Sequence, residues 1–134
     1  MGSIDTIEGI GVKSATRLRK NGIRTTEALL KKGATRAGRA QIARETGFTS
    51  KQILEWVNRA DLMRVKGVGE EYSDLLEAAG VDTVKELRNR NPENLLARIA
   101  EINKKKRLVR RLPTIGMVER WVTHAGELDP IVKY

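Results

Sequence analysis

The sequence predicts an all-α protein built from two copies of one helical unit. Matching residues recur at a constant separation of 58 positions, as Gly9 matches Gly67 and Gly22 matches Gly80. A constant separation without slippage indicates a tandem repeat of one supersecondary unit. No stretch alternates apolar and polar residues convincingly as a half-buried strand does. Only 4% of the residues are aromatic while 40% are hydrophobic, so the core must be Leu, Ile, Val and Ala, which suits helices.

Start and stop signals define the helices of the first copy. Gly22 suits a left-handed cap that ends the first helix, and either Thr25 or Thr26 can begin the next one. Thr49 or Ser50 begins a longer helix with apolar residues at near-helical spacing. The predicted helices of this copy cover residues 12–20, 26–32, 38–46 and about 50–63.

The second copy repeats the plan with its own signals. Gly80 ends its first helix, and Asn91-Pro92 is a cap followed by proline at the first helical position. Pro113 starts or precedes the last helix. The predicted helices cover about 70–79, 83–90, 92–103 and 114–127.

The two tryptophans occupy matching places on the last helix of each copy. Trp121 follows Trp56 by 65 positions rather than 58, so the second copy contains extra residues, around Lys104 to Pro113. Matching places favour buried packing anchors over base-stacking platforms.

Bulk composition limits the function classes. A chain of 134 residues suits one domain or two small fused halves. Its net charge of +9 attracts polyanions, with nucleic acid as the first candidate. The absence of cysteine excludes disulfides and thiolate chemistry and is compatible with a reducing compartment. With no visible signal peptide or membrane span, we expect a cytoplasmic protein.

The positive charge is unevenly distributed. Residues 1–64 have a net charge of +7, residues 65–101 of −3, and residues 102–120 of +6. The first half and the segment Lys104 to Arg111 are therefore the basic regions, and the sequence leaves open whether they share one face.

The segment Ile7 to Ala15 has the chemistry to hold a phosphate. Two glycines two apart permit a sharp turn and a close approach to the backbone. The following helix offers unpaired N–H groups and the positive end of its dipole. The predicted contacts come from the hairpin backbone, from basic side chains and from one hydroxyl: Gly9, Ile10, Gly11, Lys13, Ser14 and Arg17.

Both hairpins resemble the helix-hairpin-helix motif of many repair enzymes, recombinases and nucleases. The second copy, from Asp61 to Val84, is similar to the small N-terminal domain of archaeal recombinases. Residues 4–128 as a whole resemble a bacterial family of paired helix-hairpin-helix proteins whose function is unassigned. The features that carry this likeness are Gly38-Arg39, Trp56-Val57, Asn103-Lys104-Lys105-Lys106 and Leu112-Pro113.

The resemblance implies fold and a general activity. It implies two tandem helix-hairpin-helix units, residues 4–63 and 64–128, each followed by a helix pair and packed as one pseudo-two-fold domain. In the motif class, hairpin amides hold DNA phosphate without reading sequence. Some members also hold a monovalent cation on hairpin carbonyls; beyond such an ion at the first hairpin, we expect no cofactor.

The second copy departs from the phosphate-binding pattern. Glu70 and Glu71 stand where Val12 and Lys13 stand in the first copy, and carboxylates repel phosphate. We expect the first hairpin to bind a nucleic-acid backbone and the second mainly not to. The acidic hairpin can instead dock a protein partner or the basic face of another copy.

A second motif lies between the hairpins. Residues 39–57 resemble a helix-turn-helix, with Gly47 at the turn, Phe48 at the corner and Ile53 packing back. In that family the second helix enters the major groove, which would place Ser50, Lys51, Gln52 and Glu55 near base edges. A sequence-specific DNA binder is therefore one alternative. A protein-interaction adaptor with purely structural hairpins is another.

The sequence contains no catalytic set. Its one histidine, His124, is predicted on an exposed helix face, and the acids that follow Gly69 splay around one helix rather than converge on a metal. We therefore expect a non-enzymatic, sequence-tolerant DNA-binding module without a metal, a membrane or a small-molecule substrate. An auxiliary basic patch extends from Lys104, Lys105, Lys106 and Arg107 to Arg111. The sequence leaves open DNA or RNA, and single or double strand.

Overall fold

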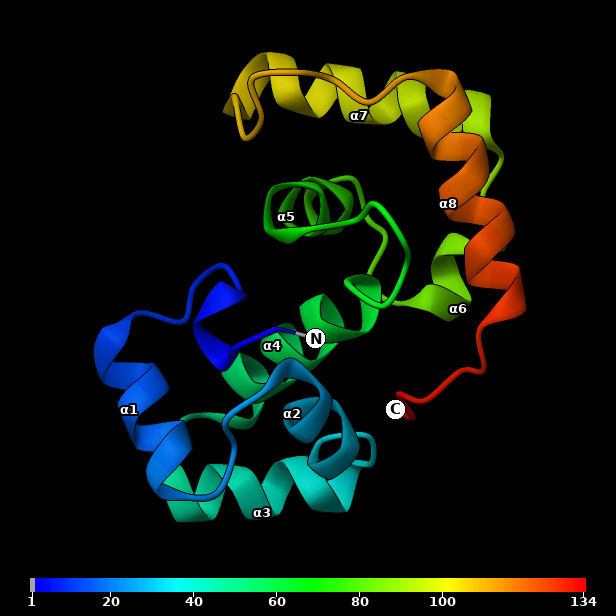
Figure 1. The fold of residues 1–134 in the computed structure, drawn as a ribbon. Helices are drawn as coiled ribbons and strands as arrows, with labels where there is room; N and C mark the ends of the chain where they lie inside the picture. Colours follow the sequence, from blue (N-terminus) through cyan, green and yellow to red (C-terminus); the bar gives the residue numbers. More distant parts are fainter. Residues whose placement is uncertain (1) are drawn as a thin grey trace. The chain divides into compact units, whose positions relative to one another are not determined.

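A computed structural model describes residues 2–134, and across these the fold is all-α, as predicted (Figure 1). Its one β-type pairing is an isolated bridge between Ser3 and Thr25. No described helix combines the length and apolar character needed to cross a bilayer. The elements in chain order are the 3₁₀ helix η1 (Ile4–Thr6) and the α-helices α1 (Val12–Lys20), α2 (Thr26–Lys32), α3 (Arg36–Thr46), α4 (Ser50–Leu62), α5 (Glu70–Ala78), α6 (Val84–Leu87), α7 (Pro92–Lys106) and α8 (Ile115–Glu127).

The helix boundaries follow local capping chemistry. The predicted ranges of the first two helices match α1 and α2. α3 begins two residues earlier than predicted, because the Thr35 hydroxyl accepts a hydrogen bond from the Gly38 amide at 3.0 Å. α7 runs three residues further than predicted, to Lys106, and ends at Arg107 in the left-handed region (φ 50°). The prediction for residues 83–90 was too long, since only Val84–Leu87 are α-helical.

The chain divides into two compact units. Unit 1 extends to Asp61 and also includes Ile131–Tyr134, whereas unit 2 comprises Leu62–Pro130. The chain therefore leaves unit 1, completes unit 2, and returns to unit 1. The pseudo-two-fold packing of the two copies stays a prediction.

Unit 1 is assembled around an aliphatic core with one tryptophan. η1 packs against α1 and α2, and α2 packs against α3 (Figure 1). Trp56 on α4 is 4% exposed, which confirms its predicted role as a buried anchor. The other buried side chains of this core include Ile4, Ile7, Ile10, Leu18, Ile23, Leu29, Ile42, Ile53 and Val57.

Unit 2 has a corresponding core on its own helices. α8 packs against both α6 and α7, and α5 packs against α7. Trp121 on α8 is 2% exposed, and its ring centroid lies 5.1 Å from that of Tyr72, so the second tryptophan is also a buried anchor. The cluster around it includes Leu75, Leu76, Val81, Leu87, Leu95, Ile99 and Val118.

A buried arginine fastens the C-terminal segment of the structure to unit 1. The Arg39 guanidinium, on a residue that is 5% exposed, donates hydrogen bonds to the carbonyls of Gly33 (2.9 Å), Ala34 (3.2 Å) and Lys133 (2.8 Å). The Lys133 amide returns a bond to the Ala34 carbonyl at 2.7 Å. Burial lowers the pKa of the Arg39 guanidinium, yet arginine stays charged at neutral pH. A charged donor thus satisfies three main-chain acceptors.

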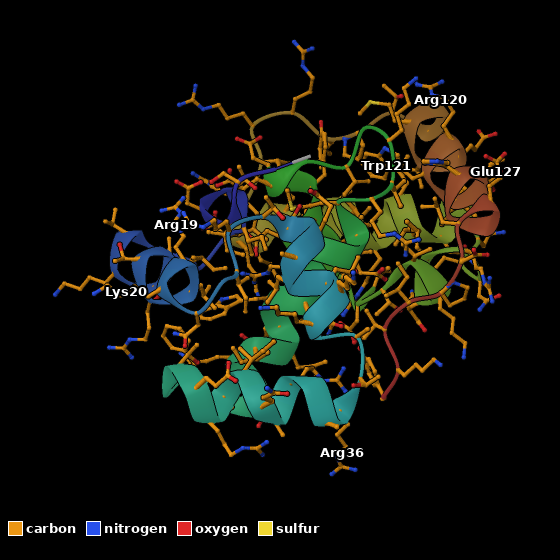
Figure 2. The ribbon with its side chains drawn as sticks, turned by 60° about the horizontal axis from the view of Figure 1, so that its bottom comes forward. Arg19, Lys20, Arg36, Arg120, Trp121 and Glu127 are labelled. Atoms are coloured by element: carbon orange, nitrogen blue, oxygen red, sulfur yellow. The ribbon has the colours of Figure 1, made fainter. Side chains whose placement is uncertain are left out.

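Replacing Arg39 by Met should cost about 2–4 kcal/mol of unfolding free energy, because the carbonyls lose charged donors while the aliphatic packing is largely kept. Urea unfolding followed by circular dichroism measures this loss. Arg36→Met is the matched control, since Arg36 lies on the same helix and is exposed, extending away from the ribbon (Figure 2). Equal stability of the two variants would show that the three hydrogen bonds contribute little.

Candidate functional site

The first hairpin is a tight turn anchored by two buried isoleucines. Ile7 and Ile10 are 1% and 5% exposed, and the Ile10 amide donates to the Ile7 carbonyl at 3.1 Å. Between them Gly9 has φ +92°, a conformation that favours glycine. A Cβ at Gly9 would also lie 3.2 Å from Nη1 of Arg59 and 3.5 Å from Nε1 of Trp56. The turn therefore requires glycine both for its dihedral angle and for its contact with α4.

The helix that follows this turn begins without a side-chain cap. Gly11 is the N-cap of α1, in extended conformation (φ −81°, ψ −177°). Among the described residues, the amides of Val12, Lys13 and Ser14 have no hydrogen-bond acceptor. A Cβ at Gly11 would meet no atom within 4 Å, so the space above these amides is open. The positive end of the α1 dipole therefore faces an accessible surface.

The uncapped start distinguishes the two hairpin helices from the others. Each of the remaining described α-helices has a Thr or Asn oxygen that accepts a first-turn amide. Only α1 and α5 begin at a glycine with no side-chain bond at the cap. The capping residues of the other helices are Thr25, Thr35, Thr49, Thr83, Asn91 and Thr114.

The predicted side chains of this site differ in their exposure and in their hydrogen-bond partners. Lys13 is exposed in the first turn of α1, and Ser14 beside it is half-buried. Ile10 is a core residue whose amide is already bonded within the turn, so it has no group to offer an anion. Arg17 donates to the Thr46 carbonyl at 3.2 Å, and its Cζ lies 5.2 Å from the centroid of the Phe48 ring. Arg17 thus joins α1 to the turn between α3 and α4.

The second hairpin repeats the backbone of the first. Gly67 has φ +90°, the Val68 amide donates to the Val65 carbonyl at 3.0 Å, and Gly69 is an open N-cap in extended conformation. A Cβ at Gly67 would lie 3.1 Å from Nε1 of Trp121. The side chains differ, however, because the exposed Glu70 and Glu71 occupy the first turn of α5. The two sites therefore share geometry and differ in charge.

A hollow of about 790 Å³ lies beside the second hairpin. It is lined by Lys66 and Gly67 and by residues of α8, including Arg120, Trp121 and Glu127, which Figure 2 labels on that helix. Basic and acidic side chains both line this hollow, so the charge of its lining favours no class of ligand.

The predicted auxiliary patch lies at the C-terminal end of α7. Lys104, Lys105 and Lys106 form its last turn, and Arg107 follows in left-handed conformation, all of them exposed. The Asn103 side chain both donates to the Val109 carbonyl (3.1 Å) and accepts from its amide (3.0 Å), which closes the loop after the helix. The patch belongs to unit 2 and the first hairpin to unit 1, so neither unit contains both.

The helix-turn-helix prediction finds its elements in α3 and α4. Gly47 is left-handed (φ 82°), and the Phe48 ring packs edge-on against Trp56 with centroids 4.9 Å apart. Ser50 and Lys51 are exposed. The Gln52 side chain is engaged locally, because its Oε1 accepts a hydrogen bond from the Thr49 backbone amide at 3.0 Å, while the Gln52 backbone amide donates to the Thr49 hydroxyl. This reciprocal capping box begins α4 and leaves Gln52 less available to read a base.

The C-terminal segment of the structure lies beside these same residues. Tyr134 lines a hollow of about 440 Å³ with Ser50, Lys51 and Arg36. The Tyr134 hydroxyl donates to Oδ1 of the buried Asn58 at 3.1 Å. The N-terminal end of α4 therefore lies beside the C-terminal segment, which the Tyr134 hydrogen bond holds in place.

Two contacts to the hairpins were not predicted. Arg59 on α4 donates a hydrogen bond to the Glu8 carbonyl, and Nδ1 of His124 on α8 accepts one from the Lys66 amide at 2.9 Å. His124 is half-buried rather than on an exposed face, so that prediction was wrong. The separation of 65 positions, which Arg59 and His124 share with the two tryptophans, marks these residues as equivalent but does not by itself indicate either contact.

Other charged groups near the first hairpin have local roles. A hydrogen bond from the Ser3 side chain, together with Arg19 at 3.5 Å, lowers the pKa of the Asp5 carboxyl. Within residues 2–134, no three or more His, Asp or Glu side chains are grouped to hold a metal ion.

Comparison with known proteins identifies a family. No solved structure matches the chain. A family model described as "Domain of unknown function (DUF4332)" matches residues 8–128, which extend from the first hairpin to just beyond α8. The chain therefore belongs to this family of unassigned function.

Proposed function

We propose that the protein is a non-enzymatic module that binds nucleic acid, DNA first of all, through the phosphate backbone and without reading sequence. The observation that supports this most is the uncapped start of α1, next to an exposed lysine, in a protein that caps its other non-hairpin helices with side-chain oxygens. Open amides at a helix N-terminus with a nearby cation suit an anionic oxygen.

The charge of α1 favours the same ligand. The helix contains Lys13, Arg17, Arg19 and Lys20 and no acidic residue, and Figure 2 shows Arg19 and Lys20 on it. The exposed carboxylates of Glu8 and of Asp5, which pairs with Arg19, oppose this attraction, but the cations of α1 outnumber them. Such an arrangement holds phosphate by charge and amide donation, neither of which distinguishes one base from another.

The resemblance of both hairpins to the helix-hairpin-helix motif supports this proposal. So does the likeness of the second copy to the N-terminal domain of archaeal recombinases. The acidic first turn of α5 makes the second hairpin a weaker phosphate site and a candidate for contact with a protein.

A salt titration of duplex binding tests the proposal. Fluorescence anisotropy with two unrelated duplexes should give similar affinities and a log–log salt slope of about −0.9 per phosphate neutralised. Lys13→Glu should weaken binding to both duplexes alike by about tenfold, while Lys66→Glu, the same change of charge at a lysine of the second hairpin, should have little effect.

Three outcomes would contradict the proposal. Equal losses for the two variants would remove the asymmetry between hairpins. A large preference for one duplex would favour the helix-turn-helix alternative. Absence of binding to duplex, single strand and RNA at moderate salt would favour a protein-interaction adaptor.

A further inference from the structure

Each hairpin is held from the last helix of its own unit, but the two contacts have opposite polarity. In unit 1 the Arg59 side chain donates to the carbonyl of Glu8, and in unit 2 the His124 side chain accepts from the amide of Lys66. Glu8 and Lys66 are equivalent, being 58 positions apart, and Arg59 and His124 are equivalent, being 65 apart like the tryptophans. The same place in the fold therefore engages an acceptor in one copy and a donor in the other.

From this contrast we infer that Arg59 is the residue that fits the first hairpin to bind an anion, and that His124 makes the second hairpin unfit. This inference rests on the proposed function, and it names a specificity-determining position that the charge of the hairpins alone does not reveal.

The amide differs first. The Lys66 N–H is used by Nδ1 of His124 at 2.9 Å. Its equivalent, the Glu8 N–H, donates to no described residue. The first hairpin therefore keeps one more donor that a phosphate oxygen can accept from.

The carbonyl of the turn and the charge of the side chain that contacts it also differ between the two copies. The Glu8 carbonyl would repel an anionic oxygen near the turn, but the Arg59 guanidinium donates to it and offsets its partial negative charge. The same guanidinium lies against the inner side of the turn, with Nη1 3.2 Å from where a Cβ of Gly9 would be. Arginine is charged at any physiological pH, whereas a ring nitrogen that accepts a hydrogen bond carries no proton. Unit 1 thus has a fixed cation beneath its hairpin and unit 2 does not.

Arg59→His tests the inference by giving the first hairpin the residue of the second. We expect duplex affinity to fall about tenfold at low salt, while Arg59→Lys, which keeps a cationic donor, should lose less. Arg44→His is the control for net charge, because Arg44 is exposed on α3 and makes no described side-chain hydrogen bond or ion pair. The Arg44→His variant should lose only about twofold in duplex affinity.

Amide hydrogen exchange supplies a measurement that does not depend on nucleic acid. In the native protein the Lys66 amide should exchange more slowly than the Glu8 amide, and His124→Ala should accelerate exchange at Lys66 selectively. In Arg59→His, slower exchange at Glu8 would show that the histidine has captured that amide.

The outcomes separate the two proposals. If the native protein binds no nucleic acid, the proposed function fails, whatever the exchange rates show. If it binds duplex but Arg59→His behaves like Arg44→His, the inference is overturned and the proposed function stands. Equal exchange at Glu8 and Lys66 in the native protein would also overturn the inference.

Discussion

Replacing Gly11 by Asp should weaken duplex binding by about thirtyfold or more at low salt without lowering the stability of the fold. Gly11 is an extended N-cap, a position where Asp is among the most favoured residues, and a Cβ there meets no atom within 4 Å. The new carboxylate accepts from the amides of the α1 first turn and adds negative charge where phosphate is proposed to bind. A gain of a few tenths of a kcal/mol in helix stability should accompany the loss of binding.

The second hairpin provides the matched control for this variant. Gly69 is also an extended N-cap, and a Cβ there likewise has no neighbour within 4 Å. Gly69→Asp should therefore leave the fold intact and change duplex affinity by about twofold at most, the effect of one added charge at a distance. Anisotropy measures binding and thermal unfolding measures stability. Undiminished binding by Gly11→Asp would refute the first hairpin as the phosphate site.

A third variant separates steric from electrostatic blocking. Gly11→Ala adds a methyl group in the same open space but neither a charge nor a capping oxygen. It should reduce affinity less than Gly11→Asp does, because the amides remain able to donate.

Trp56→Ala and Trp121→Ala should each cost about 3–5 kcal/mol of unfolding free energy, the usual loss for a large buried aromatic side chain. Both side chains are almost completely buried, and each packs beside another ring, Phe48 in unit 1 and Tyr72 in unit 2. Such a loss is a large part of the stability of a small protein.

The number of tryptophans makes this experiment specific to each unit. The sequence has two, one in each unit, so either variant keeps a single fluorophore that reports on the unit retaining it. Urea titration by circular dichroism and by fluorescence gives both transitions. The more conservative Trp→Phe changes should cost about 1–2 kcal/mol. A loss below about 1 kcal/mol for either Ala variant would contradict the anchoring role.

The elements predictable from sequence were those fixed by neighbouring residues. Thr25 and Asn91 begin helices through bonds to amides three residues away, so α2 and α7 start where the sequence placed them. The hairpin glycines and the tryptophan anchors were recognised because the chain repeats them. The end of α7 was missed because Asn103 closes the following loop through Val109, an interaction that composition and periodicity do not mark.

The candidate site was predictable only in its backbone. Lys13 and Gly11 were predicted as site residues because they lie within the hairpin motif. Arg17 lies four residues after Lys13, which suggested one shared face, but its guanidinium contacts Thr46 and Phe48, partners distant in the chain. Arg59 reaches its partner Glu8 across 51 positions, and local spacing gives no information about such a pairing.

The bond from Arg39 to Lys133 has a consequence for synthesis. It joins residues 94 positions apart, and all of unit 2 is translated between them. N-terminal regions generally fold first on the ribosome. Arg39, however, cannot bond to the Lys133 carbonyl, one of its three acceptors, until all of unit 2 has been synthesised. In the nascent first unit the Arg39 guanidinium therefore lacks its hydrogen bond to the Lys133 carbonyl. Formation of that bond should be one of the latest steps of folding, as expected for a contact of such long range.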